Sequence, residues 1–266
     1  MRSPPVFDST TEAALRYDAL HADRTADVAF YAREAGRSGF RVLEVGAGTG
    51  RVALALAAAG ARVVGLEPGA AYLAVAAAKR AAEAPDVRAR IGLVRADMRA
   101  YAFRRPFDRV LFPFRVFQAM LTVPDQLAAL EAAHGALAED GRLVLDLFDP
   151  RLDVLAEAAE GPAALAETGR GYSDARGEWR ERVAARYDLD AQIVDLTYVY
   201  ERSAPGGGVA ERSFERLRVR YFTRWEFEHL LARAGYEVEA LYGGWGGETT
   251  DIEGEDMIWI ARKAEG

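Results

Sequence analysis

Short apolar runs alternate with helical patterns along residues 41–148. Five of these runs have the length and composition of strands, at residues 41–45, 61–67, 88–95, 107–112 and 142–148. Helical patterns separate most of them, at residues 52–59, 70–82 and 124–138. Strands that alternate with helices form parallel sheets, so this order predicts an α/β fold with a doubly wound sheet. The fifth run is nearly all apolar, as expected of a strand that is covered on both faces.

The pattern changes after Pro150. A polar, helix-like stretch continues to Thr168, and three runs with strand character follow it, at about 179–189, 192–201 and 214–221. The segment Pro205-Gly-Gly-Gly208 lies between the last two and has the composition of a hairpin loop. We therefore expect an antiparallel β insertion after the fifth strand of the core.

The C-terminal part returns to the core pattern. It predicts a helix at residues 224–234 and strands at 236–242 and 257–262. A glycine-rich loop joins the two strands, which indicates an antiparallel hairpin at the edge of the sheet. With the five earlier runs, the hairpin completes a seven-stranded, mostly parallel sheet with one antiparallel edge strand.

The length of 266 residues fits one elaborated domain better than two independent units. We expect three parts: a helical N-terminal cap at 1–38, a core at 39–150 and 223–266, and the insertion at 151–222. Aromatic residues at alternate positions of the insertion would share one face of a sheet. They predict a packing or self-association face, with a substrate lid as the alternative.

The composition disfavours several classes of site and partner. The chain has no cysteine, and its three histidines are far apart, so no metal site is expected. A net charge of −7 disfavours binding to nucleic acid. No apolar run approaches the roughly 18 residues of a membrane span, and the N-terminus lacks the apolar segment of a secretion signal. We expect a cytoplasmic monomer or homodimer without a membrane partner.

Three glycines, Gly46, Gly48 and Gly50, lie between the first predicted strand and its helix. Glycine lets a ligand approach a backbone that a Cβ would block, although an ordinary turn is the alternative. The spacing differs from the G-x-G-x-x-G of dinucleotide binders, but Glu67 would also suit the ribose of a nicotinamide cofactor. Glu44 is a charged residue at a buried strand end, so it needs a partner such as a cationic ligand or loop amides.

This segment resembles the first motif of class I S-adenosylmethionine-dependent methyltransferases, an acidic residue followed by Gly-x-Gly-x-Gly. The resemblance implies a Rossmann-like methyltransferase fold with S-adenosyl-L-methionine as its cofactor. It also implies that Glu67 accepts both ribose hydroxyls, and that Asp97 binds the adenine amino group beside Met98. A carboxylate has only acceptor oxygens, which suits a diol or an amine. Further residues expected at the cofactor are Ala47, Arg51, Pro68 and Phe112.

The predicted N-terminal cap also resembles the cap of family members that methylate small molecules. In such enzymes an aromatic or basic residue of the cap covers the methionine end of the cofactor. Tyr17, Arg24 and Tyr31 are the candidates for this role.

The segment after the fourth strand reads Phe-Pro-Phe-Arg-Val-Phe-Gln at 112–118. The Asn/Asp-Pro-Pro-aromatic motif of family members that methylate nucleic-acid bases or protein glutamine is absent. We expect Arg115 to bind an anionic substrate group, unless it is an exposed residue at a helix start. The other residues expected near the substrate are Phe114, Phe117, Gln118 and Trp245.

The resemblance implies methyl transfer to a nitrogen, oxygen or carbon of a small molecule. The sulfonium is an activated donor, so positioning supplies most of the catalysis. A general base is needed only for a protonated acceptor, and His21 and Tyr221 are the candidates. Two alternatives stay open, a non-catalytic module that binds the cofactor and an enzyme that methylates a protein.

Overall fold

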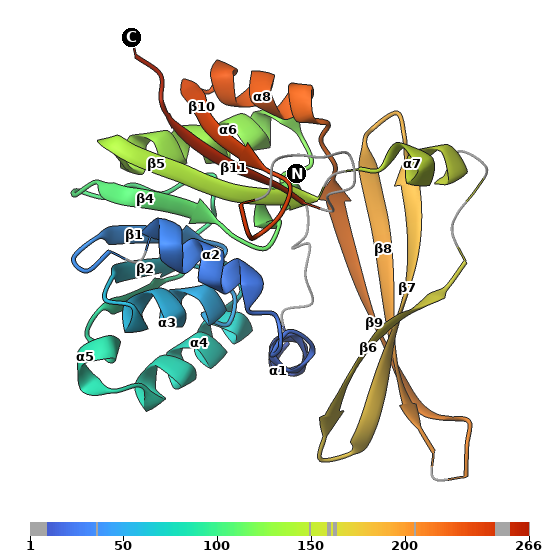
Figure 1. The fold of residues 1–266 in the computed structure, drawn as a ribbon. Coiled ribbons are helices and arrows are strands. Elements are labelled where there is room, and N and C mark those ends of the chain that lie inside the picture. The colour runs from blue at the N-terminus through green and yellow to red at the C-terminus, as the bar shows by residue number, and fades with distance from the viewer. Residues whose placement is uncertain are drawn as a thin grey trace.

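The structure is a computed structural model that describes residues 10–35, 37–148, 150–158, 161, 164–204, 206–247 and 256–265. Its central feature is a seven-stranded sheet with the strand order β10-β11-β5-β4-β1-β2-β3 (Figure 1). The strands of this sheet are β1 (Arg41–Val45), β2 (Arg62–Leu66), β3 (Ile91–Val94), β4 (Phe107–Phe112), β5 (Leu137–Phe148), β10 (Tyr236–Tyr242) and β11 (Asp256–Lys263). The expected α/β architecture is confirmed.

The antiparallel strand of this sheet does not lie at its edge. β11 pairs antiparallel with both β5 and β10, while β1 pairs parallel with β2 and β4. β10 therefore forms the edge, and β11 lies one position inside it. The expected hairpin is present, but the prediction of an antiparallel edge strand is corrected, because the sequence pattern does not show which strand of a hairpin joins the sheet.

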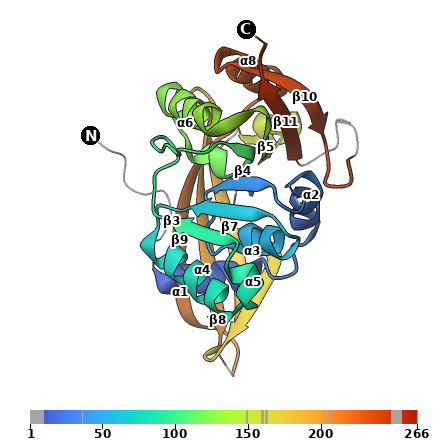
Figure 2. The same cartoon turned by 90° about the vertical axis from the view of Figure 1, so that its left-hand side faces the viewer.

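Helices cover both faces of the seven-stranded sheet (Figure 2). α2 (Ala26–Ala35) and α3 (Arg51–Ala58) pack on one face, against a cluster that contains Val42 and Leu111. α6 (Val123–Ala136) and α8 (Arg224–Arg233) pack on the other, against a cluster that contains Leu43 and Phe112. Two further helices are α4 (Ala70–Ala82) and α5 (Pro85–Arg88). Successive strand residues alternate between the two clusters, as the pleat of a strand requires.

A second sheet stands beside the carboxyl ends of the core strands (Figure 1). It is antiparallel, with the order β6-β7-β8-β9, and follows the short helix α7 (Leu152–Ala158). Its strands are β6 (Ala166–Asp174), β7 (Gly177–Asp188), β8 (Ile193–Ser203) and β9 (Val209–Arg220). The sequence pattern predicted three strands and missed β6, since this edge strand is largely exposed and shows no apolar alternation.

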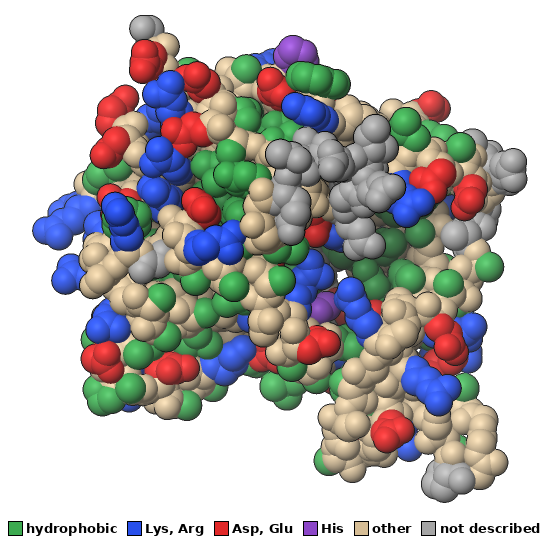
Figure 3. All heavy atoms as spheres, viewed as in Figure 1, with side chains coloured by type: hydrophobic (Ala, Val, Ile, Leu, Met, Phe, Trp, Pro, Cys, Tyr) green, Lys and Arg blue, Asp and Glu red, His purple; other side chains and the backbone are tan. Residues whose placement is uncertain are grey.

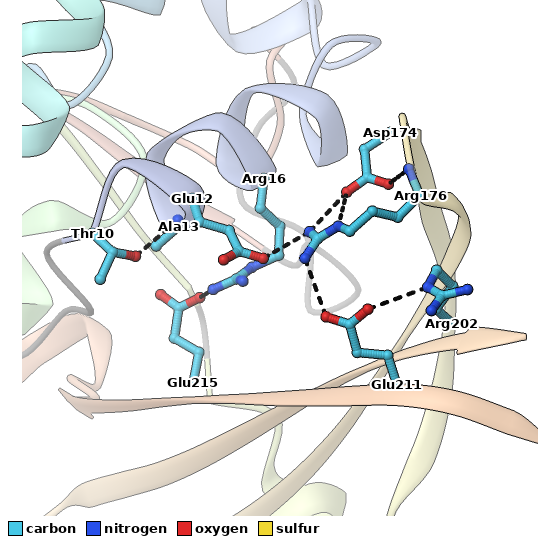
Figure 4. Close-up of polar contacts among 9 residues, drawn as sticks. All are labelled: Thr10, Glu12, Ala13, Arg16, Asp174, Arg176, Arg202, Glu211 and Glu215. Carbon is cyan, nitrogen blue, oxygen red and sulfur yellow. Dashed lines mark hydrogen bonds and ion pairs between the residues drawn. The ribbon is translucent and has the colours of Figure 1, made fainter.

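The N-terminal helix α1 (Thr11–Leu20) lies between the core and the second sheet and contacts both α4 and β6 (Figures 1 and 2). The side chain of Thr10 caps this helix by accepting from the amide of Ala13. Figure 4 shows two arginine contacts between α1 and the sheet, Arg16 with Glu215 at 2.8 Å and Arg176 with Glu12 at 2.7 Å. Helix α1 is thus attached to the second sheet as well as to the core. Residues 1–9 of the expected cap lie outside the described residues.

Within the described residues, no helix combines the length and the apolar character that a membrane span requires.

Candidate functional site

The glycine loop lies at the carboxyl end of β1, where the sheet order reverses between β1 and β4. Gly46, Gly48 and Gly50 have φ angles of +77°, +55° and +81°. Residues with a Cβ rarely adopt this left-handed conformation. A Cβ on Gly46 would also lie 2.3 Å from Cγ2 of Val116, the first residue of the short helix η1 (Val116–Ala119). The loop therefore needs glycine for its backbone angles and for its close approach to η1.

Glu67 follows β2, and its carboxylate bridges two backbone segments. One oxygen accepts from the amide of Gly48 at 3.0 Å and the other from the amide of Gly69 at 2.7 Å. Burial raises the pKa of Glu67, while these two amides lower it. A carboxylate has about four acceptor sites. About two therefore stay free for the hydroxyls of a ligand.

Glu44 is 2% exposed and lies on the face of β1 that α3 covers. Burial raises its pKa to about 8, although the positive charge of Arg51 lowers it. Its Oε2 atom is buried without a hydrogen-bond partner among the described residues. An unpaired buried acceptor is costly, so this atom fits a site that a donor from a ligand completes.

Asp97 lies beyond the end of β3 and is exposed. It forms an ion pair with Arg99 at 2.6 Å, and Arg99 also contacts Asp125 at 2.7 Å. Met98 is 8% exposed and belongs to the hydrophobic core. The two neighbouring residues therefore face different surroundings, and their contacts with adenine stay a prediction.

The end of α1 and the turn after β4 bring three rings together. His21 lies 4.7 Å from the ring of Tyr17 and 4.9 Å from the ring of Phe114, measured between ring centroids. Burial, together with the charges of Arg170, Arg51 and Arg24, lowers the pKa of the His21 imidazole to about 4. The imidazole is therefore neutral at pH 7. Figure 3 shows a histidine and basic side chains in the hollow between the core and the second sheet.

Arg51 and Arg24 approach the same Phe114 ring, at 5.4 Å and 5.0 Å from its centroid. Arg51 also donates to the buried carboxylate of Asp27 at 2.9 Å. Burial raises the pKa of Tyr17 to about 12, so its hydroxyl stays protonated at neutral pH. Of the cap candidates, Tyr17 and Arg24 therefore contact one ring, that of Phe114, beside the glycine loop.

Tyr31, the third cap candidate, is fully buried. Its hydroxyl donates to Asp146 at 2.5 Å. Trp245 packs against the rings of Phe30 and Tyr31, at 5.6 Å and 5.9 Å between centroids. Trp245 thus packs on two residues of α2, one of which is Tyr31. The contact of Tyr31 with the cofactor and that of Trp245 with the substrate stay predictions. Most of the glycine-rich loop that contains Trp245, residues 248–255, lies outside the described residues.

The segment after β4 departs in part from the expected pocket mouth. Phe117 is fully buried in the core against Phe112 and Phe227, because it is on the inner side of η1. Gln118 is also fully buried, where its amide donates to the carbonyl of Arg220 at 2.9 Å. Both side chains therefore contact the core of the protein, and their contacts with a substrate stay predictions.

Phe114 and Arg115 remain partly exposed beside the glycine loop. The Arg115 guanidinium pairs with Asp256 at 2.5 Å, so an anionic substrate would compete with an existing partner. Tyr221 is 4% exposed in a hydrophobic cluster with Val194 and Val219. This burial leaves His21 as the better placed of the two candidate bases.

Sequence reasoning missed two carboxylates that organise the site. Asp18 of α1 accepts from the hydroxyl of Thr49 in the glycine loop and from Lys79 at 3.0 Å. Asp146 of β5 accepts from the backbone amides of Phe114 and Arg115. A charged residue inside a nearly all-apolar strand was a visible signal for Asp146. No group of side chains suited to a metal ion occurs among the described residues.

Two comparisons of the sequence with known proteins match methyltransferases. Residues 42–141 match the family model described as a methyltransferase domain. Protein-L-isoaspartate O-methyltransferase from Methylorubrum populi is 41% identical over 114 residues, which cover 43% of this chain and 48% of that protein. The chain thus spans about half the length of this curated relative.

Two solved structures share the fold over nearly the whole chain. The CcbJ methyltransferase from Streptomyces caelestis has a TM-score of 0.75 and 22% identity, over 97% of this chain and 100% of that chain. CalS10, an amino pentose methyltransferase from Micromonospora echinaspora, has a TM-score of 0.68 and 24% identity, over 99% and 100%. The chain therefore has the fold of class I S-adenosylmethionine-dependent methyltransferases, with a methyltransferase domain at 42–141. The CalS10 structure contains bound S-adenosylmethionine.

Proposed function

We propose that the protein is a methyltransferase that uses S-adenosylmethionine to methylate an amine of a small, sugar-sized molecule. The observation that carries the cofactor assignment is the Glu67 carboxylate, which two loop amides hold beside the glycine loop. The likeness to an amino pentose methyltransferase supports the acceptor class. The rings of Tyr17 and Phe114 beside His21 also favour a small acceptor over a macromolecule, because they give His21 apolar surroundings.

The residues present fit the cofactor. The free acceptor sites of Glu67 suit the two ribose hydroxyls, and the unpaired Oε2 of Glu44 suits a donor such as the cationic amine of the methionine part. A Cβ on Gly48 would meet no heavy atom closer than 4.0 Å, so the backbone at Gly48 leaves room for a ligand. When bound, S-adenosylmethionine supplies an activated methyl group.

The protein then has to present a neutral nucleophile in line with that methyl group. The arginines that lower the pKa of His21 also disfavour an ammonium ion beside it, so an acceptor amine there loses its extra proton more readily. The neutral imidazole accepts a hydrogen bond from the amine and orients its lone pair. His21 is therefore proposed as the residue that aligns the acceptor.

The test is turnover of S-adenosylmethionine with matched acceptors. Free and nucleotide-linked amino sugars, the same sugars with a hydroxyl in place of the amine, and an isoaspartyl peptide are compared by mass spectrometry. We expect S-adenosylhomocysteine and a methylated product with the amino sugars alone. Methylation of the peptide alone would instead assign a protein substrate, and cofactor binding without turnover on any acceptor would assign a non-catalytic module.

A His21→Phe variant tests the alignment role. Phenylalanine keeps the ring contacts but cannot accept the hydrogen bond, so kcat should fall about 10- to 100-fold. His229→Phe is the matched control, since His229 is exposed on α8. Equal kcat values in the two variants would remove His21 from the mechanism.

A further inference from the structure

Asp146 is a buried carboxylate that the cofactor assignments do not use. It is fully buried near the carboxyl end of β5, on the sheet face that α2 covers. Its strand neighbours Leu145 and Leu147 are apolar and fully buried. A charged group in such surroundings persists only with hydrogen-bond donors around it.

Three donors surround this carboxylate. Oδ1 accepts from the amide of Phe114 at 2.7 Å and from the hydroxyl of Tyr31 at 2.5 Å. Oδ2 accepts from the amide of Arg115 at 2.9 Å. Two of the three donors are therefore successive backbone amides of the turn that leaves β4.

This turn has an uncommon backbone. Phe114 and Arg115 have φ angles of +61° and +60°, and Gln192 is the only other non-glycine residue with a positive φ in the described part of the chain. Two successive residues of this kind are strained and persist only when their surroundings require it. Asp146 holds the turn from the core side. On the other side, the Arg115 side chain donates to Asp256 at 2.9 Å.

The turn sets the position of the Phe114 ring. That ring lies 4.9 Å from the ring of His21 and 5.5 Å from the ring of Tyr17. The next residue, Val116, is in close contact with the glycine loop at Gly46. The same turn thus touches both the proposed cofactor loop and the proposed alignment residue.

We propose that Asp146 is a positioning residue for methyl transfer. Its carboxylate imposes the left-handed turn at Phe114 and Arg115, and the turn holds the Phe114 ring against His21 and Tyr17. The inference rests on the proposed function, because it makes that ring a wall of the space where the acceptor meets the methyl group. Asp146 itself touches neither cofactor nor acceptor and acts through the turn.

The first test uses the wild-type protein and needs no activity. Hydrogen exchange resolved by residue should show the amides of Phe114 and Arg115 protected by at least about 100-fold, because both donate to a buried carboxylate. Asp146→Asn should remove most of the protection from one of these two amides, because the side-chain nitrogen that replaces one oxygen cannot accept from a backbone donor. Exchange of these amides in the wild type at the rate of exposed amides would overturn the proposal.

The second test separates positioning from stability. Asp146→Asn should lower kcat about 10- to 100-fold, as expected when reacting groups are misaligned. Its dissociation constant for S-adenosylhomocysteine should stay within about threefold of wild type, because no cofactor contact is removed. The matched control is Asp108→Asn, near the amino end of β4. It removes a carboxylate that accepts a hydrogen bond from the backbone amide of Arg41 at 2.7 Å. Equal kcat losses in both variants would overturn the positioning role.

An Arg115→Gly background tests the link to the backbone. Glycine adopts the left-handed conformation without strain, so the kcat loss caused by Asp146→Asn should be at least about threefold smaller there. An undiminished loss would contradict the proposal. If Asp146→Asn does not fold, hydrogen exchange of the Phe114 and Arg115 amides in the wild type still shows whether Asp146 holds the turn. A wild type that produces no S-adenosylhomocysteine would refute the proposed function, whereas an active wild type with unimpaired Asp146→Asn would refute this inference alone.

Discussion

Glu67 is held in place before any ligand binds. The amides of Gly48 and Gly69 fix its two oxygens, so the carboxylate loses little conformational entropy when it binds a diol. The sequence predicted this residue from its place after the second strand. Its two backbone donors depend on how the glycine loop and the start of α4 approach one another in the folded chain.

Glu67→Ala should weaken the binding of S-adenosylhomocysteine by about 1–3 kcal/mol, because two ribose hydroxyls lose their buried acceptor. Titration calorimetry measures the change directly. Glu131→Ala, at an exposed position of α6, is the control and should leave the affinity unchanged. Equal affinities of Glu67→Ala and wild type would refute the assigned role.

Gly46 combines a left-handed backbone with a close contact. Gly46→Ala should lose about 1–2 kcal/mol of stability from its φ angle and about 1–3 kcal/mol more from overlap with Val116. Gly39→Ala isolates the first effect, since Gly39 has a φ of +89° and no heavy atom within 4 Å of an added Cβ. Urea denaturation of both variants gives the difference. Equal losses would show that the loop and η1 are not tightly packed.

At the scale of elements, α1 is held on the second sheet by a buried ion pair. The side chains of Arg16 and Glu215 are 4% and 14% exposed, and the guanidinium lies 4.1 Å from the ring centroid of Tyr200. Arg176 makes a more exposed contact with Glu12, with side chains 41% and 54% exposed. The two pairs, both drawn in Figure 4, should therefore differ in their contribution to stability.

Glu215→Gln should destabilise the protein by about 3 kcal/mol, because it leaves the buried Arg16 charge without its partner. Glu12→Gln breaks the exposed pair and should cost no more than about 1 kcal/mol. Chemical denaturation measures both values, and hydrogen exchange in α1 should accelerate in the first variant. Equal costs would mean that α1 is not docked through the buried pair.

At the scale of the whole molecule, buried ionisable groups link stability to pH. Burial raises the pKa of Glu44 to about 8 and that of Asp146 to about 6, and it lowers that of His21 to about 4. Between pH 6.5 and 8, Glu44 is the one of these three groups that is protonated in the folded protein and ionised in the unfolded chain. Proton release on unfolding makes the folded state less stable as the pH rises.

The free energy of unfolding of the ligand-free protein should therefore fall between about pH 6.5 and 8. Its slope should reach at most about 1.4 kcal/mol per pH unit, the value for release of one proton. Glu44→Gln removes the titrating group and should flatten this slope, while Glu131→Gln should not. A slope that is the same in all three proteins would show that Glu44 is ionised in the folded state at neutral pH.

Local patterns were enough to predict most of the fold. The helix at 70–82 and the strand at 107–112 have the predicted bounds, because their periodicity and flanking residues are local signals. β6 was missed since an exposed edge strand carries no such signal. The sequence did not predict the burial of Phe117 and Gln118, because it shows that these residues follow β4 but not which side of η1 faces the core.

The sequence by itself determined the succession of strands along the chain, the glycine loop, and the positions of Glu44 in the first strand and Glu67 after the second. Each of these features depends on neighbours close in the chain. Tertiary structure alone decided that Asp146 meets the amides of Phe114 and Arg115, and that Arg16 meets Glu215, 199 positions away. Such contacts depend on how distant elements pack, and one carboxylate in a sequence has many possible partners. Burial then selects the partners, because a charge removed from water must find donors within the folded chain.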